Sequence, residues 1–274
     1  MKKFLSVFLS VLVLLCAVSM IPEVKAERFF ADGFNGSTYE GSSTEIVDFA
    51  RKDDEEVSIK GAVPKYSNIG VYQNTCANTA GAILLGYYEK SYDELIPNFK
   101  AARVIRDKVL FATQTDAVQK VIDELYVKMD TNNGGNGTTI NGFKNGLRQY
   151  VDEKGRNIEY TSIVSNEDLS IERYKEAIEV NKPIVLFVSK YTMIPLTEIY
   201  QNDYSDKYNK KLYGGDHVLV AYGIREIQYY NEAGGLIQSV TLLLAATGYK
   251  QDPLVYVAID DRMRIIDGYT INIY

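Results

Sequence analysis

The stretch QNTCANTAGAILLGYY, residues 73–88, decides the fold that this sequence predicts. Asn74 and Thr75 have side-chain oxygens of the kind that cap a helix start, and small and apolar residues recur at helical spacing after Cys76. Two glycines in the run each weaken a helix by about 1 kcal/mol relative to alanine, which is understandable if the helix lies close against a sheet. We therefore expect a buried central helix that begins at Cys76.

Residues 1–26 have the three parts of a secretory signal: two lysines, an apolar run and a small-x-small ending at Ala26. We expect cleavage before Glu27, a secreted, extracellular or surface-associated protein, and no stable membrane association afterwards. Removal of the signal also removes Cys16, so Cys76 becomes the only thiol and no intramolecular disulfide can form. An unpaired thiol in an exported protein is a candidate reactive group.

The charge balance limits the kinds of molecule that the protein is expected to bind. The full chain of 274 residues has 30 basic and 36 acidic residues, and the part after the signal has 27 and 35, a net charge of −8. This balance argues against nucleic acid as a partner. The length suffices for one large domain or two small ones, and we expect one; the sequence indicates no oligomeric state.

Residues 27–56 are polar, show no sustained apolar period and include the mixed charge run 51–56. We expect a leader or short propeptide-like segment here, with the charge run on a solvated face, and a single domain over residues 57–274. Within that domain the fold class predicted is α+β, with helices first and a mostly antiparallel sheet second.

Apolar spacing predicts the individual elements. The helices are expected at 76–88, 89–112 with a break near Pro97, 115–129, 139–150 and 171–180. The strands are expected within 57–71 and at 157–164, 183–188, 218–222, 224–230, 238–246, 254–259 and 269–274, with 224–230 and 238–246 forming a hairpin around the turn NEAGG.

The loop DTNNGGNGTT, residues 130–139, places oxygen-bearing side chains at alternate positions, as calcium loops do. Its spacing departs from the EF-hand template, because Gly134 stands where an oxygen ligand is needed and Asn141 where a bidentate glutamate is needed. We therefore expect no metal here, and no cofactor elsewhere in the chain.

Cys76 and His217 are the candidate catalytic pair. A thiol in the first turn of a helix is favoured as a thiolate, which lowers its pKa below the free value of about 8.5, although a lone cysteine is otherwise often a buried, inert side chain. His217, the only histidine, follows about 140 residues later at the head of an apolar strand. There we expect it to look out of the sheet, hold the thiolate as an ion pair and protonate a leaving amine. A solitary histidine at a strand end is otherwise usually a surface residue.

The small residues after Cys76, the helix that ends in Tyr-Tyr and the segment HVLVAYG, residues 217–223, resemble papain-fold cysteine peptidases. They are most similar to secreted bacterial relatives of the double-glycine peptidases that process bacteriocins. The resemblance covers roughly residues 60–274. It implies a papain-like fold and hydrolysis of peptide bonds in a peptide or protein substrate.

The resemblance also implies a third catalytic residue, an Asn or Asp that orients the imidazole. In this family it follows an apolar strand, here 255–259, and precedes a Gly-Tyr strand, here 268–269. The matching residue is Asp260, with Asp261 as the alternative. Because side chains alternate along a strand, only one of the two carboxylates should face the imidazole.

The sequence departs from the family around the nucleophile. The family usually has Gly and Pro directly after the cysteine, where this chain has Ala77 and Asn78. The oxyanion glutamine expected about six residues before it is replaced by Gly70. We assign the oxyanion role to Gln73 together with the backbone N–H of Cys76.

Two other functions are compatible with these residues. The same thiol chemistry serves acyl-transfer enzymes of the amidase or transglutaminase kind. A non-catalytic surface or binding protein on the same fold is the other alternative, with the 22 tyrosines supplying a binding face. Turnover of a casein substrate under reducing conditions separates a peptidase from a binding protein.

Overall fold

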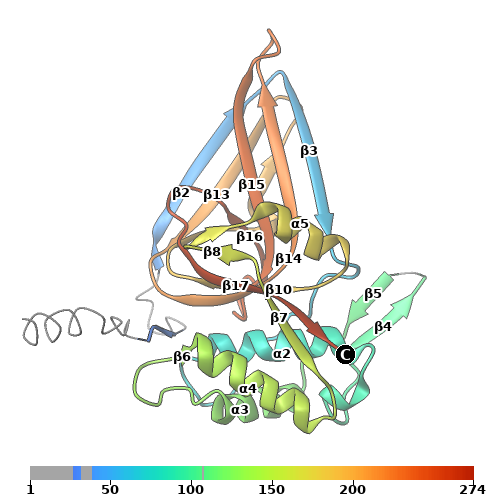
Figure 1. Ribbon diagram of the computed structural model, residues 1–274. Helices are drawn as coiled ribbons and strands as arrows, with labels where there is room; N and C mark the ends of the chain where they lie inside the picture. Colours follow the sequence, from blue (N-terminus) through green and yellow to red (C-terminus); the bar gives the residue numbers. More distant parts are fainter. Residues whose placement is uncertain (1–26, 32–38, 107) are drawn as a thin grey trace, which may run out of the picture.

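The computed structural model describes residues 27–31, 39–106 and 108–274. The predicted signal peptide lies outside these residues. The fold is α+β, as predicted: α2 (Cys76–Glu89), α3 (Asp116–Lys128) and α4 (Ile140–Glu153) form a helical layer below a large antiparallel sheet (Figure 1). The further helix α5 (Ile171–Glu179) packs on the sheet.

The described part of the chain contains a sheet of eleven strands. Its neighbours follow the order β12 (Ile199–Gln201), β13 (Ser205–Tyr213), β11 (Tyr191–Pro195), β16 (Leu254–Ala258), β15 (Leu236–Ala246), β14 (His217–Tyr230), β10 (Ile184–Val188), β17 (Ile265–Ile273) and β7 (Ile158–Ser162). In addition, β2 (Tyr39–Asp48) pairs with β13 and β3 (Arg51–Ser58) with β14.

Three smaller antiparallel pairs lie outside this sheet: β1 (Phe29–Phe30) with β6 (Thr138–Thr139), β4 (Ala102–Ile105) with β5 (Lys108–Phe111), and β8 (Val164–Ser165) with β9 (Asp168–Leu169). Two short 3₁₀ helices, η1 (Asp93–Leu95) and η2 (Leu196–Glu198), complete the elements.

The predicted central helix is confirmed. All 14 residues of α2 are buried, because the helix packs on β14 on one side and on α3 and α4 on the other. Gly81 permits the close approach of α3, since a Cβ there would lie 2.9 Å from Leu125 Cδ1 and 3.1 Å from Met129 Cε. Gly81 therefore allows a close approach to a helix, whereas a close approach to the sheet was expected from the sequence.

The predicted helices over 115–129, 139–150 and 171–180 are confirmed, as is the hairpin that β14 and β15 form. The segments 218–222 and 224–230 belong to one long strand, β14. The helix predicted over 89–112 is wrong, because α2 ends at Glu89 and η1 and the β4–β5 hairpin follow. The buried carboxylate of Glu89 accepts the backbone N–H of Ala101 at 2.7 Å, which ties this hairpin back to the helix end.

Residues 39–58 belong to the sheet, which corrects the prediction that residues 27–56 are a segment apart from the fold. β2 pairs with β13 over its whole length and β3 with β14. Together with β15 these strands rise into a tall extension above the helical layer (Figure 1). Apolar periodicity could not reveal them, because many of their partnered side chains are charged.

A polar network joins β3 to the rest of the extension. Alternate residues of the charge run 51–56 bind side chains on other strands: Lys52 binds Asp206 at 2.9 Å, Asp54 binds Arg225 at 2.7 and 2.8 Å, and Glu56 binds Tyr256 at 2.7 Å. The side chain of Asp206 has 0% exposure. Five of the six residues in the run are exposed, which confirms the expected solvated face, but half of them also bind side chains on other strands.

We expect Arg225→Leu to lower the free energy of unfolding by about 1 to 3 kcal/mol, because it removes the bidentate partner of Asp54 in a mostly buried place. The hydrogen bond from Arg225 also holds the pKa of Asp54 below its ordinary value. This contribution to stability is complete above about pH 4 and is lost as the pH falls further. Urea unfolding at pH 7 and at pH 3 measures both effects.

The matched control is Arg173→Leu, because Arg173 is exposed on α5. Its loss should change the unfolding free energy by less than about 0.5 kcal/mol. Equal losses in the two variants would show that the network does not stabilise the extension.

Candidate active site

His217 is the first residue of β14 and is buried, with 1% of its surface exposed. Its Nε2 lies 2.8 Å from the carbonyl oxygen of Thr247, and its Nδ1 lies 3.3 Å from the hydroxyl of Tyr249. The ring of Tyr249 stacks on the imidazole with the centroids 4.6 Å apart. The expectation that this histidine looks out of the sheet is wrong, because the residues after β15 cover it.

The protonation of His217 follows from these contacts. Burial lowers its pKa to about 4, although the hydrogen bond to Thr247 acts in the opposite direction, so the ring is neutral at pH 7. A carbonyl oxygen only accepts, so Nε2 carries the hydrogen and donates it to Thr247. Nδ1 then has a free electron pair and accepts the hydroxyl hydrogen of Tyr249. This tautomer leaves Nδ1 as the basic atom.

The carbonyl oxygen of Thr247 binds the ring nitrogen of His217 for which the sequence predicted a carboxylate partner. Asp260 lies after the end of β16 and its Oδ1 accepts the backbone N–H groups of Arg262 and Met263, each at 3.1 Å. Aspartate often forms such bonds within its own turn. Neither Asp260 nor Asp261, which is exposed on the same turn, is a hydrogen-bond partner of the imidazole, whose nitrogens bond Thr247 and Tyr249. An orienting role for Asp260 stays a prediction.

Cys76 begins α2, as predicted, and 3% of its surface is exposed. Thr75 occupies the N-cap position without a side-chain capping hydrogen bond. Asn74 adopts the left-handed conformation with φ of +59° and donates its side-chain amide to Asn132 Oδ1 at 2.9 Å. The turn before the helix is thus held from the loop 130–139.

Asn132 gives this loop a structural role. Its Nδ2 donates to the carbonyl oxygen of Gln73 at 3.2 Å and to the Tyr126 hydroxyl at 2.9 Å. Gln73 itself is exposed, so its backbone is fixed in place while an oxyanion role for its side chain stays a prediction. Among the described residues, no three His, Cys, Asp or Glu side chains lie together in a way that could hold a metal ion.

Tyr191 connects the surroundings of Cys76 with those of His217. Its hydroxyl lies 3.3 Å from that of Tyr249, and its ring centroid lies 5.8 Å from the imidazole. Burial raises the pKa of Tyr191 well above the ordinary value, and Tyr249, Tyr213 and the charge of a Cys76 thiolate raise it further.

The turn 247–253 covers the first turn of α2. At Gly248, where φ is +75°, a Cβ would lie 3.1 Å from Cγ2 of Thr79, which is one helical turn after Cys76. An ion pair between Lys211 and Asp252 at 2.5 Å fastens the far end of the turn to β13.

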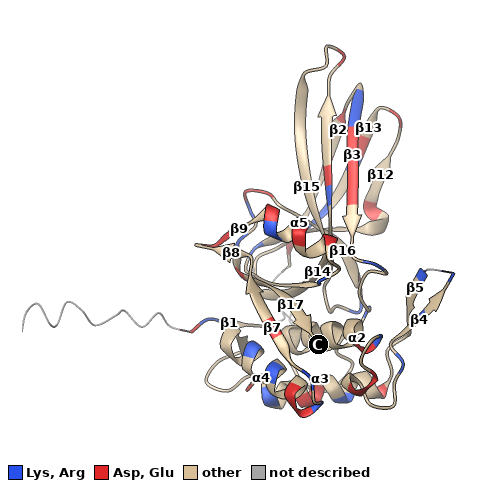
Figure 2. Ribbon diagram, turned by 45° about the vertical axis from the view of Figure 1, so that its right-hand side comes forward, with Lys and Arg blue, Asp and Glu red and all other residues tan. Residues whose placement is uncertain are grey.

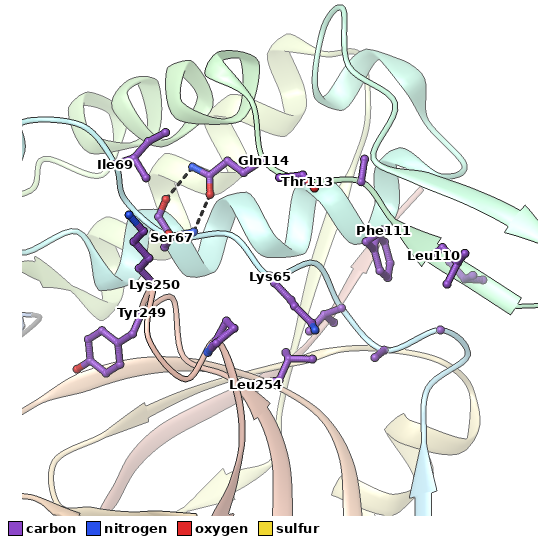
Figure 3. Close-up of a pocket in the computed structure, with 16 residues that line it drawn as sticks. Lys65, Ser67, Ile69, Leu110, Phe111, Thr113, Gln114, Tyr249, Lys250 and Leu254 are labelled. Atoms are coloured by element: carbon purple, nitrogen blue, oxygen red, sulfur yellow. Dashed lines mark hydrogen bonds between the residues drawn. The ribbon is translucent and has the colours of Figure 1, made fainter. Parts of the chain in front are cut away.

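A groove of about 610 Å³ starts at the same turn and runs between residues 61–69 and 109–114 (Figure 3). Tyr249 and Lys250 lie at one end of the lining, and Leu110 lies at the other. Tyr249 therefore belongs both to the groove and to the surroundings of His217.

Sequence reasoning missed three residues around the imidazole: Tyr191, Thr247 and Tyr249. The predicted hairpin contained the signal for two of them, because antiparallel pairing returns the end of β15 to the start of β14. Val220 pairs with Ala246. Counting three residues back from Val220 and three forward from Ala246 places Tyr249 opposite His217.

A scan against protein-family models matches no family, and searches of curated proteins and of solved structures find no similar chain. Over residues 27–31, 39–106 and 108–274, no helix is both long and apolar enough to cross a membrane. No similar protein therefore indicates what chemistry the site performs, and only the geometry of the site bears on it.

We expect His217 to make stability fall between about pH 6.5 and pH 4. The unfolded chain protonates the histidine near pH 6.5, whereas the folded protein does so only near pH 4. Between these values the unfolded state binds more protons, so the unfolding free energy decreases by up to about 3 kcal/mol as the pH falls, and the contribution is complete above pH 6.5.

Urea unfolding of the parent and of His217→Gln at pH 7 and pH 4.5 measures this effect. The parent should lose more stability than the variant between the two pH values. An equal loss in both proteins would mean that the imidazole protonates as readily in the folded state as in the unfolded one.

Proposed function

We propose that this chain is a secreted cysteine peptidase with a papain-like fold, in which Cys76 is the nucleophile and His217 the general base and acid. The observation that carries the proposal is that His217 is held as a base of defined tautomer, with Nε2 against the Thr247 carbonyl and Nδ1 against the Tyr249 hydroxyl. The arrangement of the fold supports it, because the cysteine begins a buried helix that packs on the strand that the histidine begins.

In the proposed reaction Nδ1 of His217 accepts the proton of the Cys76 thiol, and the thiolate attacks the carbonyl carbon of the scissile amide. The oxyanion accepts hydrogen bonds from the backbone N–H of Cys76 and from the side-chain amide of Gln73. The imidazolium then gives its proton to the leaving amine, and water hydrolyses the thioester. Throughout, the Thr247 carbonyl accepts the Nε2–H and fixes the tautomer.

Tyr249 defines the resting state of this site. Its hydroxyl occupies Nδ1, the atom that must take the thiol proton. Its ring also shields the imidazole from water, which is part of why the pKa of His217 is low. When substrate displaces the ring, Nδ1 is freed, and a neighbouring thiolate then raises the pKa of the imidazole and favours the ion pair.

A non-catalytic binding protein is the second candidate, and one observation favours it. His217 is buried with both ring nitrogens bonded, as a core histidine is. Its replacement therefore costs stability whichever candidate is correct, about 1 to 3 kcal/mol. Activity, and not stability, separates the two.

We expect Cys76→Ser and His217→Gln each to lower kcat/KM for a fluorogenic casein by at least about 10³-fold under reducing conditions. The reason is that one variant lacks the thiolate and the other lacks the base that generates it. Assays at a temperature where circular dichroism shows each variant folded remove the stability effect. A folded His217→Gln protein that cleaves casein like the parent would leave the binding protein as the better candidate.

For Asp260→Ala we expect kcat/KM within about threefold of the parent and a stability loss of about 1 kcal/mol, because the side chain bonds its own turn and not the imidazole. Asp260→Asn, which keeps the accepting oxygen, should restore the stability. If Asp260→Ala is folded yet as inactive as His217→Gln, the carboxylate orients the imidazole after all.

A further inference from the structure

The groove that ends at Tyr249 is selectively basic. Its lining contains Lys65 and Lys250 and no acidic side chain, although the whole chain has a net charge of −6. Two other surface pockets of the protein are lined by acidic residues such as Glu55 and Glu226. Charge on this groove is therefore opposite in sign to that of the protein as a whole.

The two lysines are available to a ligand. None of the ion pairs formed within the described part of the chain includes Lys65 or Lys250, and both residues are exposed. Lys250 extends from the turn beside Tyr249 and Lys65 from the segment that runs along the groove (Figure 3). The groove lining therefore carries an ammonium group from each of two segments.

The β4–β5 hairpin continues the basic character beyond the groove. Arg103, Arg106 and Lys108 are exposed on it, and Figure 2 shows basic residues at this hairpin. Its second strand, β5, supplies residues 109–111 of the groove wall that residues 109–114 form. Clustered like charges of this kind raise the local concentration of a ligand of opposite sign.

The remaining lining fits an extended peptide. Apolar side chains, among them Val63, Phe111 and Leu254, contribute to the lining, and burial of such surface gives affinity for an apolar residue. The segment around Lys65 belongs to no helix or strand, and both backbone groups of Ser67 are bonded to the Gln114 side chain, at 2.7 and 2.8 Å. This wall of the groove is therefore fixed before a peptide binds.

We propose that this groove binds an extended peptide in which glutamate or aspartate neighbours an apolar residue, with Lys65 and Lys250 contacting the carboxylates. The inference rests on the proposed function in so far as the bound peptide is the substrate. Tyr249 then links recognition to chemistry, because a peptide that fills the end of the groove displaces the ring that covers His217.

Binding is measured on the full mature chain carrying Cys76→Ala, so that the probe is not cleaved. The probes are the fluorescein-labelled peptide Gly-Ser-Ala-Leu-Glu-Leu-Glu-Ala-Ser-Gly and the same peptide with both glutamates replaced by glutamine. Fluorescence anisotropy should give a Kd about tenfold lower for the glutamate peptide at low salt, as two partly solvated charge pairs would produce. Raising the salt should reduce the difference.

The variant Lys65→Gln/Lys250→Gln should bind both peptides with Kd values within about twofold of each other. Lys120→Gln, which changes an exposed lysine of α3 outside the groove lining, should keep the tenfold preference. Equal binding of the two peptides by the unaltered groove, or a preference that persists in the double variant, would overturn the proposal. So would tighter binding of an oligothymidylate of equal charge, which would indicate a nucleic-acid site.

Cleavage by the protein with its thiol intact separates this inference from the proposed function. If the peptidase proposal alone fails, neither peptide is cleaved, yet the binding preference and its loss in the double variant remain. If the groove proposal alone fails, both peptides are cleaved with equal kcat/KM.

Discussion

The burial of His217 beneath Tyr249 determines what this site can do. A stacked ring at 4.6 Å and two hydrogen bonds replace water around the imidazole. The resulting fall of its pKa to about 4 keeps the ring neutral. A neutral imidazole whose Nε2–H is held by a carbonyl is ready to accept a proton at Nδ1, but only after the tyrosine hydroxyl leaves that atom.

The rest of the fold places Cys76 and His217 at the starts of two elements that pack on each other, α2 and β14. α2 is buried on every side, so the position of Cys76 is fixed by packing on β14 and by the close approach of α3 at Gly81. The turn before the helix is held by Asn132 from a neighbouring loop. β14 carries His217 at its start and is paired along its further length with β3 and β15. The turn 247–253 joins the two places, because Thr247 and Tyr249 contact the imidazole while Tyr249, Lys250 and Pro253 line the groove.

The elements that depend on a local residue pattern could be predicted from the sequence. Those that depend on contacts between distant segments could not. The helix that begins at Cys76 and the β14–β15 hairpin were predictable from apolar spacing. β2 and β3 were not, because residues such as Lys52 and Asp54 have partners far away in the chain, at Asp206 and Arg225. The aspartate at 260 was assigned to the imidazole from its place after a strand, whereas the strand ends earlier and the side chain bonds its own turn. The Thr247 carbonyl could not be found from side-chain chemistry. Every residue has a backbone carbonyl oxygen, so the residue type does not show which one binds the imidazole.

The pH dependence of Cys76 alkylation by iodoacetamide tests the central claim most directly. In the proposed mechanism the thiolate forms once the Tyr249 hydroxyl leaves Nδ1 of His217, and iodoacetamide traps it in that open state. If Cys76 and His217 form a catalytic pair, the rate profile of the parent then follows an apparent pKa well below the value of about 8.5 of a free thiol. In His217→Gln the profile should move to 8.5 or above, and the rate at pH 6 should fall at least about tenfold. Profiles that coincide in the two proteins, both with the pKa of an ordinary thiol, would contradict the account.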